Sequence, residues 1–440
     1  MIEKMMRLKI KHLFYLVVLI LLLTYLSQSL FQWHLSNQIS SGKKKQINNL
    51  TRILECRKYS DLTEYCLYEN ACLHRKSSFE YLFLFVTDNK AKDNVEFKFN
   101  GYSSVFDNFE PSDPFGNVIE PSVDKNPLPH RSMLWNARYV STRYFDQHGT
   151  LYENECHAVL AIDVVAVQIF HWAIKVAPLF IYRYENRHNN QSLCKRFNIK
   201  ILNRMQNVYR NDWQDKFLRL AANIESDEQI EYDDSKSSQN GIKCYRRLLV
   251  PGMARYIFTG PTESIEFRKE AANRHGLVYE RRRVVLVLRR DRLILNKDEL
   301  VKFLTTRFGA DLVDVTYLDK LTFEQQVKLM SKAKLLISVH GAALTNVIFM
   351  PKLSALVEIL PPYFPLSLYE RIALQSYLHY FKFLTDYDPA IHNSTQFEFC
   401  ANTTNIYVYK CFETWRDANV FVDMAKFSDM LKKVLEIVQD

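Results

Sequence analysis

Residues 282–360 alternate between short β-branched runs and segments with helical apolar spacing. The strand-like runs begin with "RRVVLVLRR" at 282–290 and end with "SALVEIL" at 354–360, and the helical segments between them include "NKDELVKFLTTRFG" and "TFEQQVKLMSKA". This repeat predicts an open parallel sheet with helices on both faces. Ligands bind such sheets beyond the carboxyl ends of the strands. We therefore expect the functional residues of this region directly after its strands.

The turn in "SVHGAALTN" places His340, Gly341 and Ala342 where a strand ends and a helix begins. A helix N-terminus has unpaired N–H groups and a partial positive charge, so it favours a phosphate group. Glycine lets the backbone approach a ligand closely, and His340 could donate to a phosphate oxygen. The alternative for such a histidine, taken alone, is a structural residue with satisfied hydrogen bonds.

Charged residues lie on two other predicted strands of this sheet. Arg289 and Arg290 end the first strand, and the arginine fork binds phosphate oxygens bidentately. Glu358 lies in the fourth strand, where a buried carboxylate is costly unless it is paired. An acid at this distance from a phosphate turn suits the hydroxyls of a ribose. The alternative for Arg289 and Arg290 is a solvated basic turn. The alternative for Glu358 is an ordinary salt bridge with a nearby Arg or Lys.

The segments "RRDRLILNKDEL" and "LLISVHGAALTNVIFMPKLSALVEILP" resemble glycosyltransferase family 61, and "CLYENAC" (66–72) and "RDANVFVDMAKF" (416–427) are similar to further family segments. The resemblance implies an α/β protein with the GT-B fold, in which two Rossmann-like domains face a cleft. It also implies an inverting, UDP-sugar-dependent transferase that moves N-acetylglucosamine or xylose to a glycoprotein or glycan. The resemblance also implies that Glu358 binds the ribose of the donor. The positions that match family motifs and would bind the donor are Arg289, Arg292, His340, Gly341, Ala342, Thr345, Asn346 and Glu358.

The catalytic base is less well defined. The family pattern has an acid before Pro-Leu-Phe in a helix of the N-terminal domain, but "FHWAIKVAPLF" (170–180) has Ile174 and Lys175 where that acid is expected. His171 and Asp163 are the candidates to take the proton of the acceptor hydroxyl. A core or helix-surface role is the alternative for both.

The missing acid motivates a second interpretation, a non-catalytic glycosyltransferase-like protein that binds a sugar or a partner. A third is a metal-dependent GT-A enzyme that uses "DYD" (386–388) as its metal site. We assign no metal ligand and expect no cofactor beyond the UDP-sugar, although a divalent metal fits the chemistry. The net charge of +9 comes from scattered basic residues, so a nucleic-acid partner is not expected.

Residues 13–31 carry no charge and follow four basic residues, a pattern that predicts one membrane helix with the N-terminus in the cytosol. A cleaved signal peptide is the alternative. The expected location is the Golgi or endoplasmic reticulum membrane, as a single-pass type II protein with a lumenal catalytic domain. The predicted divisions are a cytosolic tail (1–12), an anchor (13–31), a stem (32–55), an acceptor-side Rossmann-like domain (56–265), a UDP-sugar-binding Rossmann-like domain (266–385) and an extension packing back on the body (386–440).

Cysteines and glycosylation sequons agree with a lumenal location. The chain has eight cysteines without C-x-x-C spacing, which favours disulfides. Their pairing cannot be deduced from sequence, although Cys400 and Cys411 flank a predicted hairpin and are expected to join. Four N-x-S/T sequons follow the predicted anchor, at Asn49, Asn190, Asn393 and Asn402.

Overall fold

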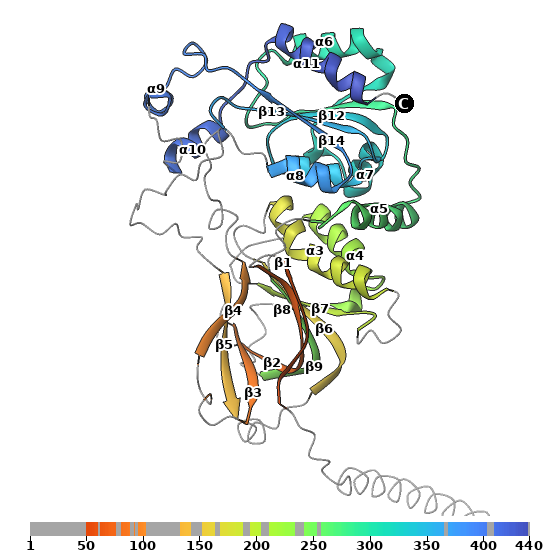
Figure 1. Cartoon of the computed structure of the whole chain (residues 1–440), viewed down its shortest axis with the longest axis vertical. Coiled ribbons are helices and arrows are strands. Elements are labelled where there is room, and N and C mark those ends of the chain that lie inside the picture. Colours follow the sequence, from red (N-terminus) through yellow and green to blue (C-terminus); the bar gives the residue numbers. More distant parts are fainter. Residues whose placement is uncertain are drawn as a thin grey trace, which may run out of the picture. The chain divides into compact units, whose positions relative to one another are not determined.

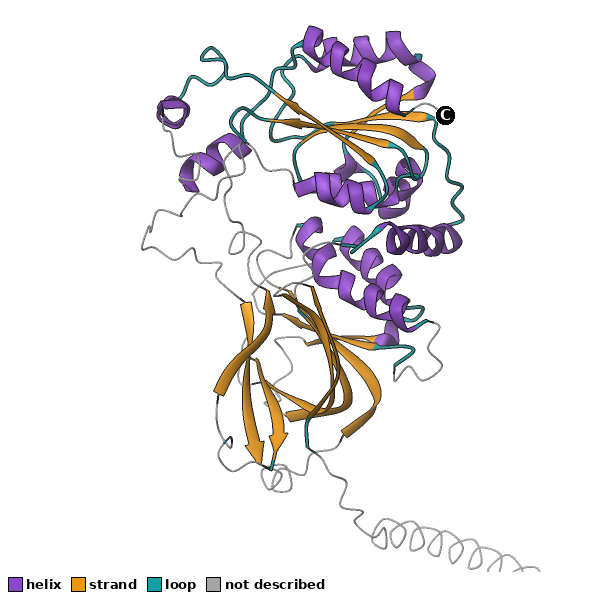
Figure 2. Cartoon of the chain, in the orientation of Figure 1, coloured by secondary structure: helices purple, strands orange, loops and turns teal. Residues whose placement is uncertain are grey.

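The structure is a computed structural model, shown in Figures 1 and 2. It describes residues 50–59, 62–75, 81–88, 92, 96–102, 133–141, 152–162, 168–187, 194–203, 211–233, 242–252, 257–364, 368–402 and 409–438. From Leu50 onward the chain forms one compact unit, and it contains two β-sheets.

The C-terminal sheet contains the four predicted parallel strands and a fifth, β14, that the sequence patterns did not predict. Its five strands have the order β11-β10-β12-β13-β14, and every neighbouring pair is parallel. Because parallel strands end at the same edge, the residues that follow β10, β12 and β13 lie near one another. The strands are β10 (Arg283–Val287), β11 (Val313–Thr316), β12 (Ala333–Val339), β13 (Ala355–Leu360) and β14 (His379–Leu384).

Helices cover both faces of this sheet (Figure 1). Alternate residues of β10 separate the faces, as the two-residue period of a strand requires. Val284 and Leu286 pack in a cluster with α6 and α11. Val285 and Val287 pack in a cluster with η5, α7 and α8. The helices are α6 (Lys297–Phe308), α7 (Phe323–Met330), η5 (Ala342–Phe349), α8 (Leu368–Gln375) and α11 (Met424–Ile437), with short η3 (Ala310–Leu312), η4 (Leu318–Lys320), α9 (Thr395–Asn402) and α10 (Tyr409–Arg416).

The N-terminal sheet is mixed. Its strands β6, β7 and β8 are parallel and alternate with α3 and α4, which fits a Rossmann-like unit. The strand pairs β1–β2, β2–β3, β2–β9 and β4–β5 are antiparallel, and the sequence patterns did not predict them. The elements are β1 (Arg52–Tyr59), β2 (Leu62–Arg75), β3 (Tyr81–Thr87), β4 (Glu96–Tyr102), β5 (Met133–Ser141), β6 (Tyr152–Ile162), α3 (Ile169–Asn186), β7 (Asn198–Asn203), α4 (Asp212–Ala222), η2 (Asp227–Gln229), β8 (Ile230–Asp233) and β9 (Ile242–Pro251).

Helix α5 (Pro261–His275) follows the N-terminal sheet, and the predicted boundary between residues 265 and 266 falls inside it. The largest hydrophobic cluster contains residues of α3 and α4 together with residues of η5, α7 and α8. The two sheets are therefore connected by a continuous core, and the division into domains stays a prediction.

All eight cysteines form disulfides, as their number and spacing predict. The expected pair Cys400–Cys411 is confirmed, but it joins helices α9 and α10 and not the two strands of a hairpin. The other three pairs are Cys56–Cys66, Cys72–Cys244 and Cys156–Cys194.

Three of the predicted features fall outside the described residues: the anchor at 13–31 and the sequons at Asn49 and Asn190. Within the described ranges, every helix is too short or too polar to cross a membrane. Asn393 and Asn402 are described, and both are exposed.

Candidate functional site

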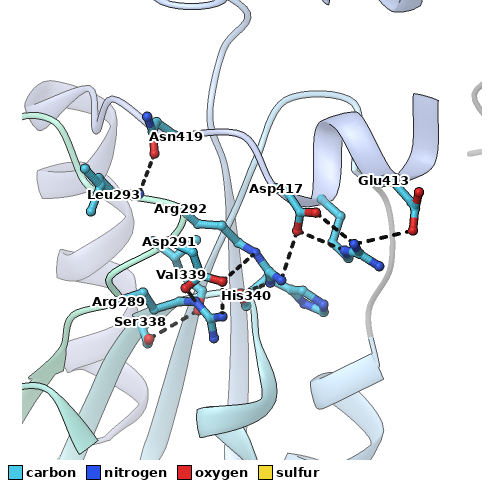
Figure 3. A network of polar contacts seen from close by, with 11 residues as sticks. Arg289, Asp291, Arg292, Leu293, Ser338, Val339, His340, Glu413, Asp417 and Asn419 are labelled. Carbon is cyan, nitrogen blue, oxygen red and sulfur yellow. Dashed lines mark hydrogen bonds and ion pairs between the residues drawn. The ribbon is translucent and has the colours of Figure 1, made fainter. Parts of the chain in front are cut away.

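Arg289 follows β10 and lies directly against the turn after β12 (Figure 3). Its Nε and Nη2 atoms donate to the two carboxylate oxygens of Asp291, at 3.1 and 2.9 Å. A Cβ atom placed on Gly341 would overlap the Arg289 guanidinium. Gly341 also has a φ of 158°, in the region that favours glycine. Glycine is thus required here because an arginine, as well as any ligand, approaches the backbone closely.

Arg292 holds the same turn from the other side. Its backbone is left-handed, with a φ of 56°, and its Nη1 donates to the His340 carbonyl oxygen at 2.8 Å. Its Nη2 lies 3.1 Å from Oδ1 of Asp417. Burial and the neighbouring Arg289 lower the pKa of Arg292 from its ordinary value. Burial alone would raise the pKa of Asp417, but Arg416 and Arg292 lower it overall.

The chain after α10 is fastened to the loop that carries these arginines. Asn419 Oδ1 accepts from the backbone N–H of Leu293 at 2.7 Å (Figure 3). Asn296 exchanges two hydrogen bonds with the backbone of Val422, at 2.8 and 3.0 Å. The motif residue Asn296 therefore anchors the C-terminal extension, which in turn places Asp417 beside Arg292.

His340 is buried at the end of β12. Its Nδ1 lies 2.5 Å from Oε1 of Glu358, which is fully buried in β13. The second oxygen of that carboxylate accepts from the Tyr380 hydroxyl of β14 at 2.7 Å. Burial and the Glu358 charge raise the pKa of Tyr380, so this hydroxyl keeps its proton. The rings of Phe364 and Tyr369 contact the imidazole edge-on, with centroids 4.8 and 5.4 Å away.

Thr345 and Asn346 are fully buried on η5. The Asn346 side chain accepts from Trp213 Nε1 at 2.9 Å and donates to Gln326 and to the Ala343 carbonyl oxygen, at 3.1 and 3.0 Å. Trp213 belongs to α4, so this amide links the N-terminal part of the chain to η5. In this arrangement Asn346 is a structural connector, and its donor-binding role stays a prediction.

The first turn of α3 approaches the His340 region through aromatic contacts. Phe170 lies 6.0 Å from Tyr369, and Tyr369 lies 5.4 Å from His340, as ring centroids. His171 is the next residue of α3 and is half-buried. Asp163 lies outside the described residues. The structure thus brings the helix of one proposed base close to the proposed donor residues.

Two other charged motifs are already used within the protein. Arg290 is exposed and pairs with Asp319 through a 2.6 Å hydrogen bond, so it does not join Arg289. Asp386 of the "DYD" segment pairs with Lys426 at 2.6 Å, and Asp388 accepts from the backbone of Ala390 at 2.9 Å. No group of three or more potential metal ligands occurs among the described residues.

In the part of the chain that the structure describes, Nε of Arg292 is buried without a hydrogen-bond partner. The hydrogen bonds made by Arg289 and His340 leave Nη1 of Arg289 and Nε2 of His340 unused. Nη1 is a donor, and Nε2 donates when both ring nitrogens carry a proton. Arg289 and Arg292 side chains are only 15% and 11% exposed. Buried donors are normally satisfied by a partner. The site is therefore suited to an anionic ligand with several acceptor oxygens.

Residues 169–357 match the family model of glycosyltransferase 61. The predicted resemblance to this family is confirmed. The protein O-linked-mannose β-1,4-N-acetylglucosaminyltransferase 2 of Homo sapiens is 41% identical over 71 residues, which cover 16% of this chain and 12% of that protein. Proteins of the same name from Danio rerio and Xenopus laevis are 37% and 38% identical over 71 residues, with the same coverage of 16% and 12%.

The chain thus matches only about an eighth of the length of these relatives, since the aligned segment covers 12% of each. The family match and the relatives' names support a role in glycosyl transfer. The parallel strands of both sheets fit a Rossmann-like glycosyltransferase.

Sequence reasoning missed four side chains that organise this site. Asp291 and Asp417 lie inside quoted motif segments, but salt-bridge partners of arginines have no fixed spacing in sequence. Tyr380 and Trp213 come from elements far along the chain from their partners Glu358 and Asn346. Only the buried position of Glu358 signalled that it needs such a partner.

Proposed function

We propose that this protein is an inverting glycosyltransferase of the secretory pathway. It transfers N-acetylglucosamine or xylose from a UDP donor to a glycoprotein or glycan. The observation that carries this proposal is the unpartnered, buried Nε of Arg292 beside the unused Nη1 of Arg289 and Nε2 of His340 around the Gly341 turn, within the described part of the chain. A diphosphate has the oxygens and the charge that these donors require.

On the donor side, Arg289 and Arg292 bind the diphosphate, and His340 and the amides of Gly341 and Ala342 complete the contact. Charge accumulates on the diphosphate as the bond from the sugar to UDP breaks. Donors already fixed by Asp291, Asp417 and the turn stabilise that charge without rearranging.

On the acceptor side, the base that takes the hydroxyl proton is His171, with Asp163 as the second candidate. The aromatic contacts from Phe170 through Tyr369 to His340 support His171, because they bring its helix to the donor residues. The displacement needs one base and one stabilised leaving group, so no resident metal is assigned.

The remaining parts of the proposal concern architecture and location. The two sheets belong to the GT-B arrangement, and residues 13–31 anchor the chain in the Golgi or endoplasmic reticulum membrane. Four disulfides and the exposed sequons at Asn393 and Asn402 support an oxidising, glycosylating compartment.

The test uses the purified full-length chain, a panel of UDP-sugars, and O-mannosyl, EGF-repeat and N-glycan acceptors, with and without EDTA. Arg289→Ala and His340→Ala should each lower UDP affinity or turnover at least about tenfold, because each removes a charge-assisted contact. Arg290→Ala is the matched control: this arginine pairs with Asp319 away from the turn and should retain wild-type kinetics. Wild-type kinetics in the first two variants would refute the proposed pocket.

A non-catalytic binding protein is the second candidate, favoured by Ile174 and Lys175 at the position of the missing acid. Binding of UDP without transfer or hydrolysis, across the whole panel, would favour it. Loss of transfer in EDTA would instead favour a metal-dependent enzyme.

A further inference from the structure

Glu358 is fully buried, and each of its carboxylate oxygens already has a partner. Its side chain is 0% exposed, and its two oxygens are taken by His340 Nδ1 at 2.5 Å and by the Tyr380 hydroxyl at 2.7 Å. The family resemblance suggests that this acid binds the donor ribose. To do so, the carboxylate would have to become accessible from a position that the present packing closes completely.

We infer that Glu358 is a positioning residue that acts through His340 and does not contact the ribose. A carboxylate only accepts, so His340 must donate from Nδ1. That hydrogen bond fixes the orientation of the ring and leaves Nε2 as the atom that meets the ligand. Nε2 donates to a phosphate oxygen when both ring nitrogens carry a proton. Tyr380 holds the carboxylate from the opposite side, and the rings of Phe364 and Tyr369 restrain the imidazole.

The charged and titratable groups around His340 come from four elements. Glu358 is on β13, Tyr380 on β14, Tyr369 on α8, and Arg292 on the loop after β10, where it binds the His340 carbonyl oxygen. Among the described residues, the only carboxylate hydrogen-bonded to the imidazole is Glu358. The inference rests on the proposed function, because it assigns His340 to the diphosphate.

The experiment is a double-mutant cycle on the full-length chain, with UDP and inorganic pyrophosphate as separate ligands in calorimetry. Glu358→Gln keeps the shape of the side chain but removes its charge. It should weaken UDP and pyrophosphate by the same factor, about tenfold, because the loss occurs at the diphosphate. In the His340→Ala background, Glu358→Gln should not lower either affinity further, because the effects of two residues that act through one contact are not additive.

Tyr380→Phe provides a second variant in case Glu358→Gln folds poorly. This substitution removes one hydrogen bond from the Glu358 carboxylate. It should lower the affinities for UDP and pyrophosphate by the same factor, and only when His340 is present. Glu370→Gln is the matched control: Glu370 is a neighbouring carboxylate on α8 that influences Tyr380 by charge alone, and its loss should leave both affinities unchanged.

The outcomes separate the alternatives. A loss confined to UDP, or one that persists without His340, means that Glu358 contacts the ribose and overturns the inference alone. A fall in melting temperature with unchanged affinities would show a purely structural role and also overturn it. A wild-type chain that binds neither ligand overturns the proposed function together with the inference.

Discussion

Replacing Gly341 by alanine tests whether the close approach of Arg289 to the turn matters for the ligand. The new Cβ would lie 2.5 Å from Arg289 Cζ and 3.2 Å from Nε, and it would overlap Nη1. These three atoms are its nearest neighbours, so the clash is with this one side chain. The guanidinium must therefore move, and its bidentate contact with Asp291 must break or tilt.

The expected effect on stability is modest. Asp291 is 63% exposed, so its pair with Arg289 contributes about 0–1 kcal/mol to the free energy of unfolding. An unfavourable backbone region adds about 1–3 kcal/mol for a residue other than glycine. The effect on ligand affinity should be larger. Displacing Nη1 of Arg289 from the turn removes a charge-assisted hydrogen bond to the ligand of about 1.5–3 kcal/mol, or roughly ten- to hundredfold in Kd.

The measurements are urea unfolding and calorimetric binding of pyrophosphate to the full-length chain. Arg289→Ala provides the control background, because it removes the atoms that the new Cβ would meet. There Gly341→Ala should cause no further loss of affinity and should retain only the backbone cost in stability. Wild-type affinity in Gly341→Ala, or full additivity of the two losses, would refute the reasoning.

Two further predictions concern stability. Trp213→Phe should lower the free energy of unfolding in urea by about 1–3 kcal/mol, because it leaves the buried Asn346 Oδ1 without its donor, and an unchanged free energy of unfolding would contradict this. Stability should also fall as the pH drops below about 4, which acid titration followed by circular dichroism can measure. Folding lowers the pKa of several carboxyls, so their contribution to the free energy of unfolding is present above their unfolded pKa values and is lost when they are protonated. These carboxyls are Glu231, Glu266, Asp291, Glu324 and Asp417. A stability that stays constant down to about pH 3 would contradict this.

The C-terminal sheet could be predicted because its signals are local. Strands β10, β12 and β13 are short apolar runs that are buried on both faces, and α7 has a side-chain cap at Thr322. The segment after Gly341 differs in type, because it is a 3₁₀-helix. The predicted strand that begins at Ala310 is extended only over Val313–Thr316, and β14 was not predicted. The parallel arrangement then places Arg289 and His340 at one edge without further information.

The N-terminal sheet could not be predicted in the same way. Its antiparallel strands pair with partners far along the chain, and β2 contacts β9 across most of its length. The same reason hides the partners of Glu358 and Asn346, since Tyr380 and Trp213 belong to other elements. An acid in an apolar segment of the sequence indicates that it needs a partner, but only the three-dimensional structure shows which residue that partner is.

The place of β9 in the N-terminal sheet has a consequence for how the chain is made. This strand lies between β2 and β6, and Cys244 on β9 is joined to Cys72 on β2, 172 residues earlier. During synthesis β2 and β6 must wait for β9 before the sheet can close, with their edges unpaired in the interval. Cys56, Cys66 and Cys72 emerge together before Cys244, so Cys72 must stay reduced until its partner arrives. The early Cys56–Cys66 hairpin removes two competing thiols and favours the correct long-range pair.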